Sequence, residues 1–145
     1  RVMRGAHKKR ALVIISDGQD NNSRFSYAEL RRYLKEADVI IYSVGIIDGS
    51  DGSLALAGEG VLKQLSELTG GKAFFPHQDG AFDELFERIA LELRHQYSIG
   101  YVPKDFQPDG KWRRLKAKVT PPRGMPNLSV RGREGYYATP VALDK

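Results

Sequence analysis

The sequence predicts an α/β protein with a mainly parallel sheet, flanking helices and an antiparallel β extension at the C-terminal end. Two short apolar segments rich in β-branched residues, 11–16 and 39–46, flank one helix-length segment, which is the pattern of a parallel β-α-β unit. After residue 102 the sequence changes to short strand-like segments between proline and glycine turns. We therefore expect an α/β domain over residues 1–102 and the β extension over residues 103–145.

The first strand is expected at residues 11–16 and ends next to an aspartate. Five consecutive apolar residues, three of them β-branched, are too few for a helix and indicate a strand buried on both faces. Ligands of an open α/β sheet bind at the carboxyl ends of its strands, which is where Asp17 falls. Gly18 lets the chain turn sharply there. Asp17 is therefore the leading candidate for a functional residue, although an aspartate at this position can also be a turn or capping residue.

Three helices follow from amphipathic spacing. Ser26 and Glu29 form a capping-box pattern at the start of the first. The glycine-rich segment 48–60 is expected to be a mobile loop near the same sheet edge as Asp17, and a second helix over about 61–69 is expected to end at Gly70 and Gly71. The third helix is expected over 81–95, with acidic residues in its first turn and basic residues in its last.

Further strands are expected at 72–76, at 97–102 and within the extension. In the extension, Leu115, Ala117 and Val119 alternate with Lys116 and Lys118, which is the period of a half-exposed strand. We expect an antiparallel arrangement that begins with the strand at 97–102 and turns at 107–110, with other strands at 112–119, 128–131 and 135–138.

The composition excludes several classes of function. The 145 residues make about one domain, and no apolar run approaches the roughly 18 residues that a membrane span needs. The net charge of +5 is spread along the chain, which favours solubility over nucleic-acid binding. There is no cysteine, so disulfides and thiolate metal sites are impossible. No complete dinucleotide-binding or phosphate-loop motif is present.

Other catalytic and metal patterns are incomplete. The histidines His7, His77 and His95 are far apart in the sequence, so a zinc site is not indicated and each is expected to be a surface or cap residue. Asp48, Ser50 and Glu59 fit part of a calcium-loop frame, but that frame lacks its required glycine. Spacing alone does not exclude a Ser-His-Asp set, but there is no Gly-x-Ser-x-Gly motif.

The residues after Asp17 favour a hard cation. Asp20, Asn21 and Asn22 carry the oxygen atoms that magnesium prefers, and a site that keeps several waters needs only one or two carboxylates. These three residues are also candidates for contacts with a partner.

Six segments together resemble a known family. Residues 9–18, 37–46 and 65–71 resemble the second half of a von Willebrand factor A-type domain, and residues 91–101, 112–116 and 135–138 are similar to its bacterial VWFA-related subgroup. The resemblance implies a Rossmann-like sheet with a metal-ion-dependent adhesion site, in which Mg²⁺ completes its shell with an Asp or Glu carboxylate of a protein partner. It also implies a bacterial protein that is secreted or periplasmic.

Only one ligand position of that family is matched. The family uses an Asp-x-Ser-x-Ser loop, a threonine from a later loop and the aspartate of a (Ser/Thr)-Asp-Gly motif, and Asp17 alone corresponds. The frames that start at Asp48 and Asp51 lack the final serine and follow the wrong strand. This chain alone is therefore expected to bind Mg²⁺ weakly or not at all, because one carboxylate gives too few ligands. The missing strands would leave residues 11–16 as an open edge, able to pair with another copy or with the rest of its own chain.

Three functions remain open from the sequence. The first is a metal-assisted protein-binding module without catalysis, with Asp17 as a metal ligand. The second is an α/β hydrolase-type enzyme that uses Asp17 as a base or metal ligand. The third is a structural module with a degenerate metal site, in which the β extension makes the contacts.

Overall fold

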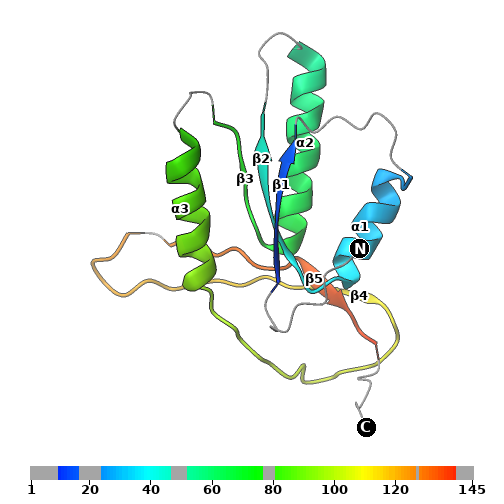
Figure 1. Ribbon diagram of the computed structural model, residues 1–145. Helices are drawn as coiled ribbons and strands as arrows, with labels where there is room; N and C mark the ends of the chain where they lie inside the picture. The colour runs from blue at the N-terminus through cyan, green and yellow to red at the C-terminus, as the bar shows by residue number, and fades with distance from the viewer. Residues whose placement is uncertain (1–9, 17–23, 47–51, 77–80, 127, 140–145) are drawn as a thin grey trace.

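A computed structural model describes residues 10–16, 24–46, 52–76, 81–126 and 128–139. The chain has a mixed α/β fold, with a three-stranded parallel sheet flanked by helices and a separate two-stranded antiparallel sheet (Figure 1). The predicted fold class is therefore confirmed.

The parallel sheet contains β1 (Ala11–Ser16), β2 (Ile40–Gly45) and β3 (Ala73–Phe74), in the order β1-β2-β3. The pairing of β1 with β2 runs from Ala11 opposite Ile40 to Ser16 opposite Gly45. β3 pairs with the second half of β2, where Ser43 lies opposite Ala73. The prediction of parallel strands joined by a helix is confirmed, because α1 (Tyr27–Glu36) connects β1 to β2.

The start of α1 is fixed by the predicted capping box. The Ser26 hydroxyl accepts a hydrogen bond from the backbone N–H of Glu29 at 3.3 Å, and the Glu29 carboxylate accepts one from the backbone N–H of Ser26 at 2.8 Å. These reciprocal bonds satisfy two N–H groups that have no partner inside the helix. The hydrogen bonds from Ser26 also lower the pKa of Glu29.

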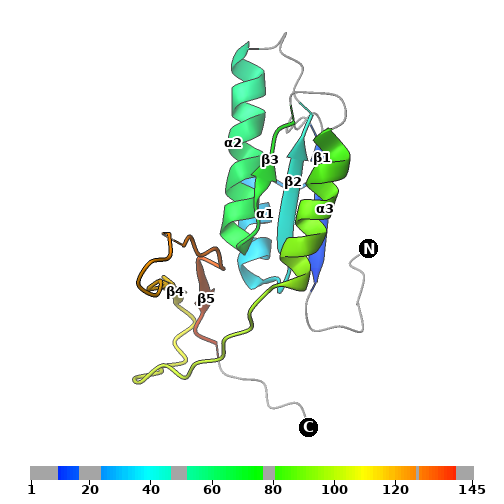
Figure 2. The same ribbon diagram turned by 90° about the vertical axis from the view of Figure 1, so that its left-hand side faces the viewer.

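Helices cover both faces of the sheet (Figures 1 and 2). α1 and α2 (Gly52–Thr69) lie on one face, where Leu34, Leu65 and Leu68 pack around Ile41 of β2. α3 (Ala81–Arg94) lies on the other, where Leu85 and Ile89 pack against alternate residues of the same strand, Tyr42 and Val44. β2 is therefore the centre of the core, since successive side chains of a strand point to opposite faces.

β1 differs from the prediction in its burial. Leu12 and Ile15 are 48% and 54% exposed, so the expectation of a strand buried on both faces is wrong in this chain. The reason is that buried side chains of the helices pack around β2, and β1 pairs with only one strand among the described residues. Within this part of the chain, the predicted open edge at residues 11–16 is present.

α2 is longer than predicted. The sequence predicts a loop over 48–60, but within the described residues the helix begins at Gly52 and continues unbroken to Thr69. Leu62, Leu65 and Leu68 are buried in its second half, and tertiary packing of such a face outweighs the low helix propensity of Gly58 and Gly60. The predicted end is confirmed, because the amide of Gly70 bonds to Glu67 O, and Gly70 has a φ of +85°.

The antiparallel sheet contains β4 (Trp112–Arg114) and β5 (Gly135–Tyr137), with Arg113 opposite Tyr136. It lies at the end of the molecule opposite the carboxyl ends of β1 and β2 (Figure 1). Arg133 attaches it to the α/β part by donating hydrogen bonds to Lys35 O at 2.8 Å and Ala37 O at 3.1 Å. Arg133 of the extension thus supplies hydrogen-bond donors to carbonyl groups at the C-terminal end of α1, where the helix itself offers none.

Three strands predicted near the C-terminus are corrected. Residues 97–102 form no strand, the strand expected at 112–119 ends at Arg114, and residues 128–131 form none. β4 pairs with β5, and the antiparallel arrangement does not begin at residue 97. Tyr97 and Ile99 are 93% and 82% exposed, because an alternating sequence forms a strand only where another strand offers backbone partners.

Candidate functional site

The carboxyl ends of β1 and β2 meet at one edge of the sheet. Ser16 lies opposite Gly45, and its carbonyl accepts a hydrogen bond from the amide of Ile46 at 3.1 Å. Both strands end here, so the chain segments that follow them leave the sheet from neighbouring points. In α/β sheets such points form ligand-binding crevices.

The predicted site residues lie outside the described residues. Asp17 follows Ser16 directly in the sequence, and Asp20, Asn21 and Asn22 belong to the segment 17–23. Residues 48–51, the start of the loop predicted at 48–60, also lie outside the described residues. The structure therefore describes β1, the strand that precedes Asp17, but does not place the Asp17 carboxylate.

Close packing at the carboxyl end of β2 requires a glycine at position 45. A Cβ atom on Gly45 would lie 2.4 Å from the ring of Phe75 and 3.3 Å from Leu62. The aromatic ring therefore occupies the space that any larger residue at position 45 would need. Two residues before Gly45 in β2, the hydroxyl of Ser43 accepts a buried hydrogen bond of 2.9 Å from the hydroxyl of Ser66 in α2. These contacts hold the end of β2 in place.

The described residues contain no cluster of side chains that could form a complete metal site. Within residues 10–16, 24–46, 52–76, 81–126 and 128–139, no group of three or more His, Cys, Asp or Glu side chains could hold a metal ion. His95 is the histidine within these ranges, and its Nδ1 lies 2.8 Å from Leu91 O at the end of α3. It is a cap residue, as predicted, whereas His7 and His77 lie outside the described residues.

The described part of the calcium-loop frame, residues 52–59, is helical. Glu59, its last position, lies inside α2 and forms an i,i+4 ion pair of 2.9 Å with Lys63. Ser53 and Ala55, which belong to the frame that starts at Asp51, are also in α2, while Asp48, Ser50 and Asp51 lie outside the described residues.

Folding creates a polar cluster that the sequence does not indicate. Glu92 Oε2 of α3 lies 2.6 Å from Arg131 Nη2 of the extension, and Tyr42 of β2 lies beside them. Burial raises the pKa of the Tyr42 hydroxyl, and the negative charge of Glu92 raises it further, whereas Arg131 lowers it. The three residues come from separate elements, so their spacing carries no recognisable motif.

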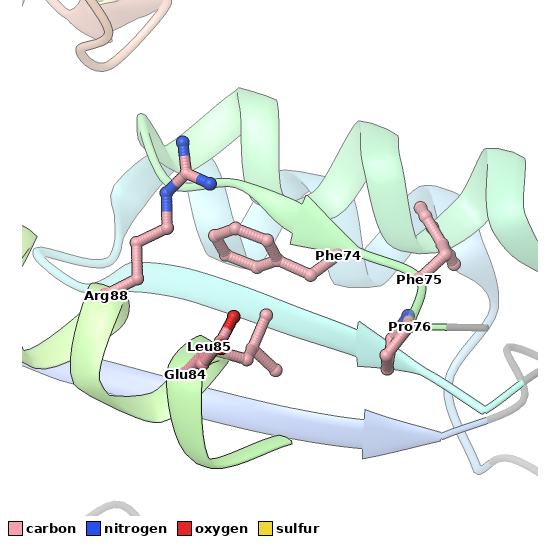
Figure 3. Close-up of a pocket in the computed structure, with 6 residues that line it drawn as sticks. All are labelled: Phe74, Phe75, Pro76, Glu84, Leu85 and Arg88. Atoms are coloured by element: carbon pink, nitrogen blue, oxygen red, sulfur yellow. The ribbon is translucent and has the colours of Figure 1, made fainter. Parts of the chain in front are cut away.

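A shallow groove lies between β3 and α3 (Figure 3). Its volume is about 280 Å³, and its lining is Phe74, Phe75, Pro76, Glu84, Leu85 and Arg88. Four of the six lining residues are aromatic or aliphatic, and α3 adds one cation and one anion, so the surface of the groove is mixed, polar and apolar. None of these residues is recognisable as a site in the sequence, because each fits the apolar or polar pattern of its own element.

Comparisons with known proteins give one distant likeness. No family model matches the chain, and no curated protein matches it. A crystal structure of an uncharacterized membrane spanning protein from Vibrio fischeri is similar over 57% of this chain and 47% of that chain, with 24% sequence identity and a TM-score of 0.46. The match thus spans less than half of that chain, and we attach no function to it. Within the described ranges, no helix has the length and apolarity required to cross a membrane.

Proposed function

We propose that the chain is a metal-assisted protein-binding module without catalysis of its own. The observation that supports this proposal most is the position of Asp17 in the sequence, directly after the residue at which β1 ends. Ser16 lies opposite Gly45, the last residue of β2, and its carbonyl accepts a hydrogen bond from the amide of Ile46. The two strands therefore end side by side at one point. Such a point is where α/β sheets bind ligands.

The residues have distinct roles in this proposal. The Asp17 carboxylate holds a divalent cation, for which Mg²⁺ is the natural choice because it prefers oxygen ligands. The bound cation supplies a coordination position for an Asp or Glu carboxylate of the partner. Asp20, Asn21 and Asn22 contact the partner around that position. Since one carboxylate provides few ligands, the affinity of this chain alone for the cation is low.

Paramagnetic NMR can detect such weak binding. Titration of the ¹⁵N-labelled chain with Mn²⁺ should broaden the amide signals of Ser16 and Ile46 first, since these residues flank the end of β1. Excess Mg²⁺ should restore the signals. Asp17→Asn should abolish the selective broadening, whereas Asp105→Asn, which removes an exposed carboxylate of the extension, should leave it unchanged.

Two results would contradict the proposal. Equal broadening in the Asp17→Asn variant would mean that Asp17 is not a ligand, and the degenerate structural module would then be favoured. Turnover of generic esters or phosphoesters that Asp17→Asn removes would support the hydrolase instead. If the proposal holds, an acidic peptide should slow the dissociation of Mn²⁺ from the wild-type chain but not from the Asp17→Asn variant.

A further inference from the structure

β3 is the outer strand of the parallel sheet on the side opposite β1, and no described strand pairs with its outer side. The Lys72 carbonyl accepts a hydrogen bond from the amide of Ser43 at 3.1 Å, so Lys72 directs its backbone groups toward β2. Successive residues of a strand direct these groups to opposite sides, and Ala73 and Phe75 therefore direct theirs away from β2. No other described strand pairs there, because the sheet order is β1-β2-β3. An added strand would find donors and acceptors at these two residues.

The groove between β3 and α3 lies directly beside this free side. Phe74, Pro76 and Leu85 give it an apolar floor, and Figure 3 shows the Arg88 side chain extending along the same side of β3 as Phe74. Its volume of about 280 Å³ is large enough for one or two apolar side chains rather than for a drug-sized ligand. The groove is therefore suited to a side chain of a strand that pairs with β3.

The charges around the groove select the partner. Lys72 lies with its Nζ 5.0 Å from the centre of the Phe74 ring, and Arg88 stands at the rim. Neither cation forms an ion pair with any described residue, whereas Lys63 nearby is neutralised by Glu59. Glu84 is the one acid among the lining residues. Lys72, Arg88 and Glu84 together carry a net charge of +1, which favours a carboxylate of the partner beside the two cations.

We propose that an extended acidic peptide binds as an additional strand along the free edge of β3. One bulky apolar side chain of the peptide fills the groove, and a carboxylate two residues along the peptide, on the same face of the added strand, pairs with Arg88. The mode is strand addition, in which main-chain hydrogen bonds give affinity and a pocket for alternate side chains gives specificity. A polynucleotide satisfies the charge but not the backbone donors and acceptors of Ala73 and Phe75. The proposed peptide would pair with β3, whereas Asp17 follows β1, the strand at the other side of the sheet order β1-β2-β3.

The test uses the whole 145-residue chain and a fluorescein-labelled peptide with the sequence Thr-Asp-Thr-Phe-Thr-Glu-Thr, whose two carboxylates lie on the same face of the strand as the phenylalanine. Binding is measured by fluorescence anisotropy in EDTA, so that no cation at Asp17 contributes. We expect saturable binding that Arg88→Glu weakens at least tenfold. Arg94→Glu is the matched control, since it makes the same charge change six residues further along α3, away from the groove, and should change affinity less than twofold.

The same peptide N-methylated at alternate residues tests the strand pairing without altering the protein. It keeps every charge but loses the N–H donors that would face β3, so its affinity should fall at least tenfold. Equal binding of the methylated peptide would overturn the proposal, as would absence of saturable binding. Equal weakening by Arg88→Glu and Arg94→Glu, or equal displacement by a single-stranded oligonucleotide of the same charge, would show diffuse electrostatic attraction and would also overturn it.

Discussion

The hydroxyl oxygen of Thr69 accepts a hydrogen bond of 2.9 Å from the backbone N–H of Ile41, and both residues are buried. The amide of Ile40 bonds to Arg10 O on the β1 side, so the Ile41 amide points toward the other side of β2. β3 begins too late to reach it, because its pairing starts at Ser43. The last residue of α2 therefore replaces a strand partner and joins the helix to the central strand.

Removal of this hydroxyl should destabilise the fold. Thr69→Val keeps the shape of the side chain but leaves the Ile41 amide buried without an acceptor, which costs about 1–3 kcal/mol of the free energy of unfolding. Thr69→Ser keeps the acceptor and should lose less. Urea denaturation followed by circular dichroism measures both variants. Equal stability of Thr69→Val and wild type would mean that the Ile41 amide finds another partner.

Gly71→Ala should be more damaging than its small size suggests. A Cβ atom at this position would lie 1.9 Å from the carbonyl oxygen of Ile41, which is backbone and cannot rotate away. We expect a loss of at least about 2 kcal/mol in the free energy of unfolding, because β2 or the α2–β3 connection must move.

Gly60→Ala is the matched control for that substitution. The space around a Cβ at Gly60 is open and the residue lies inside α2, so the change should stabilise the protein by up to about 1 kcal/mol through helix propensity. Thermal unfolding of the two variants should shift in opposite directions. A shift in the same direction would contradict the close packing of Gly71 against β2.

Arg131 holds the extension to α3 through Glu92 and also acts on Tyr42. Arg131→Ala should raise the pKa of the Tyr42 hydroxyl further above its ordinary value, because the charge that lowers it is lost while burial and Glu92 remain. Residues 115–130 should also become more sensitive to limited proteolysis. The titration is followed by the ¹³Cζ signal of Tyr42, and Arg123→Ala, an exposed arginine outside this cluster, should change neither readout.

The turn before β4 should lose part of its stability in acid. The hydrogen bond from Arg113 at 2.8 Å, together with the Lys111 amide, lowers the pKa of Asp109. A carboxyl whose pKa is lower in the folded chain stabilises it above the unfolded pKa, and this contribution is lost as the pH falls through the folded pKa. Arg113→Ala should raise the pKa of Asp109 toward 3.8, as measured by carboxyl ¹³C NMR, whereas Arg114→Ala should not.

The open edge of β1 should make the chain associate at high concentration. Leu12, Val13 and Ile15 are all exposed beside backbone groups that no described strand pairs with. Uncovered edges of this kind pair with other chains, and charged residues prevent it. Sedimentation velocity should show a concentration-dependent dimer or larger species that Val13→Lys reduces. Association unchanged by this substitution would place the contact elsewhere.

Much of the α/β part could be predicted from local sequence. The capping box at Ser26 and Glu29, the end of α2 at Gly70 and the amphipathic stripe of α3 depend on contacts within a few residues, so the sequence alone determines them. The parallel pairing of β1 with β2 follows from the helix between them. The choice of Asp17 as a site residue rests on the same local logic and stays a prediction.

Tertiary structure decided what depends on distant partners. The sequence at 97–102 alternates like a strand but has no partner strand, and segment 48–60 contains four glycines yet largely joins a helix whose later turns are buried. Glu92, Arg131 and Tyr42 come together only because α3, the extension and β2 pack against one another. Pairing, burial and long-range charge contacts depend on which surfaces meet, and no local pattern specifies that.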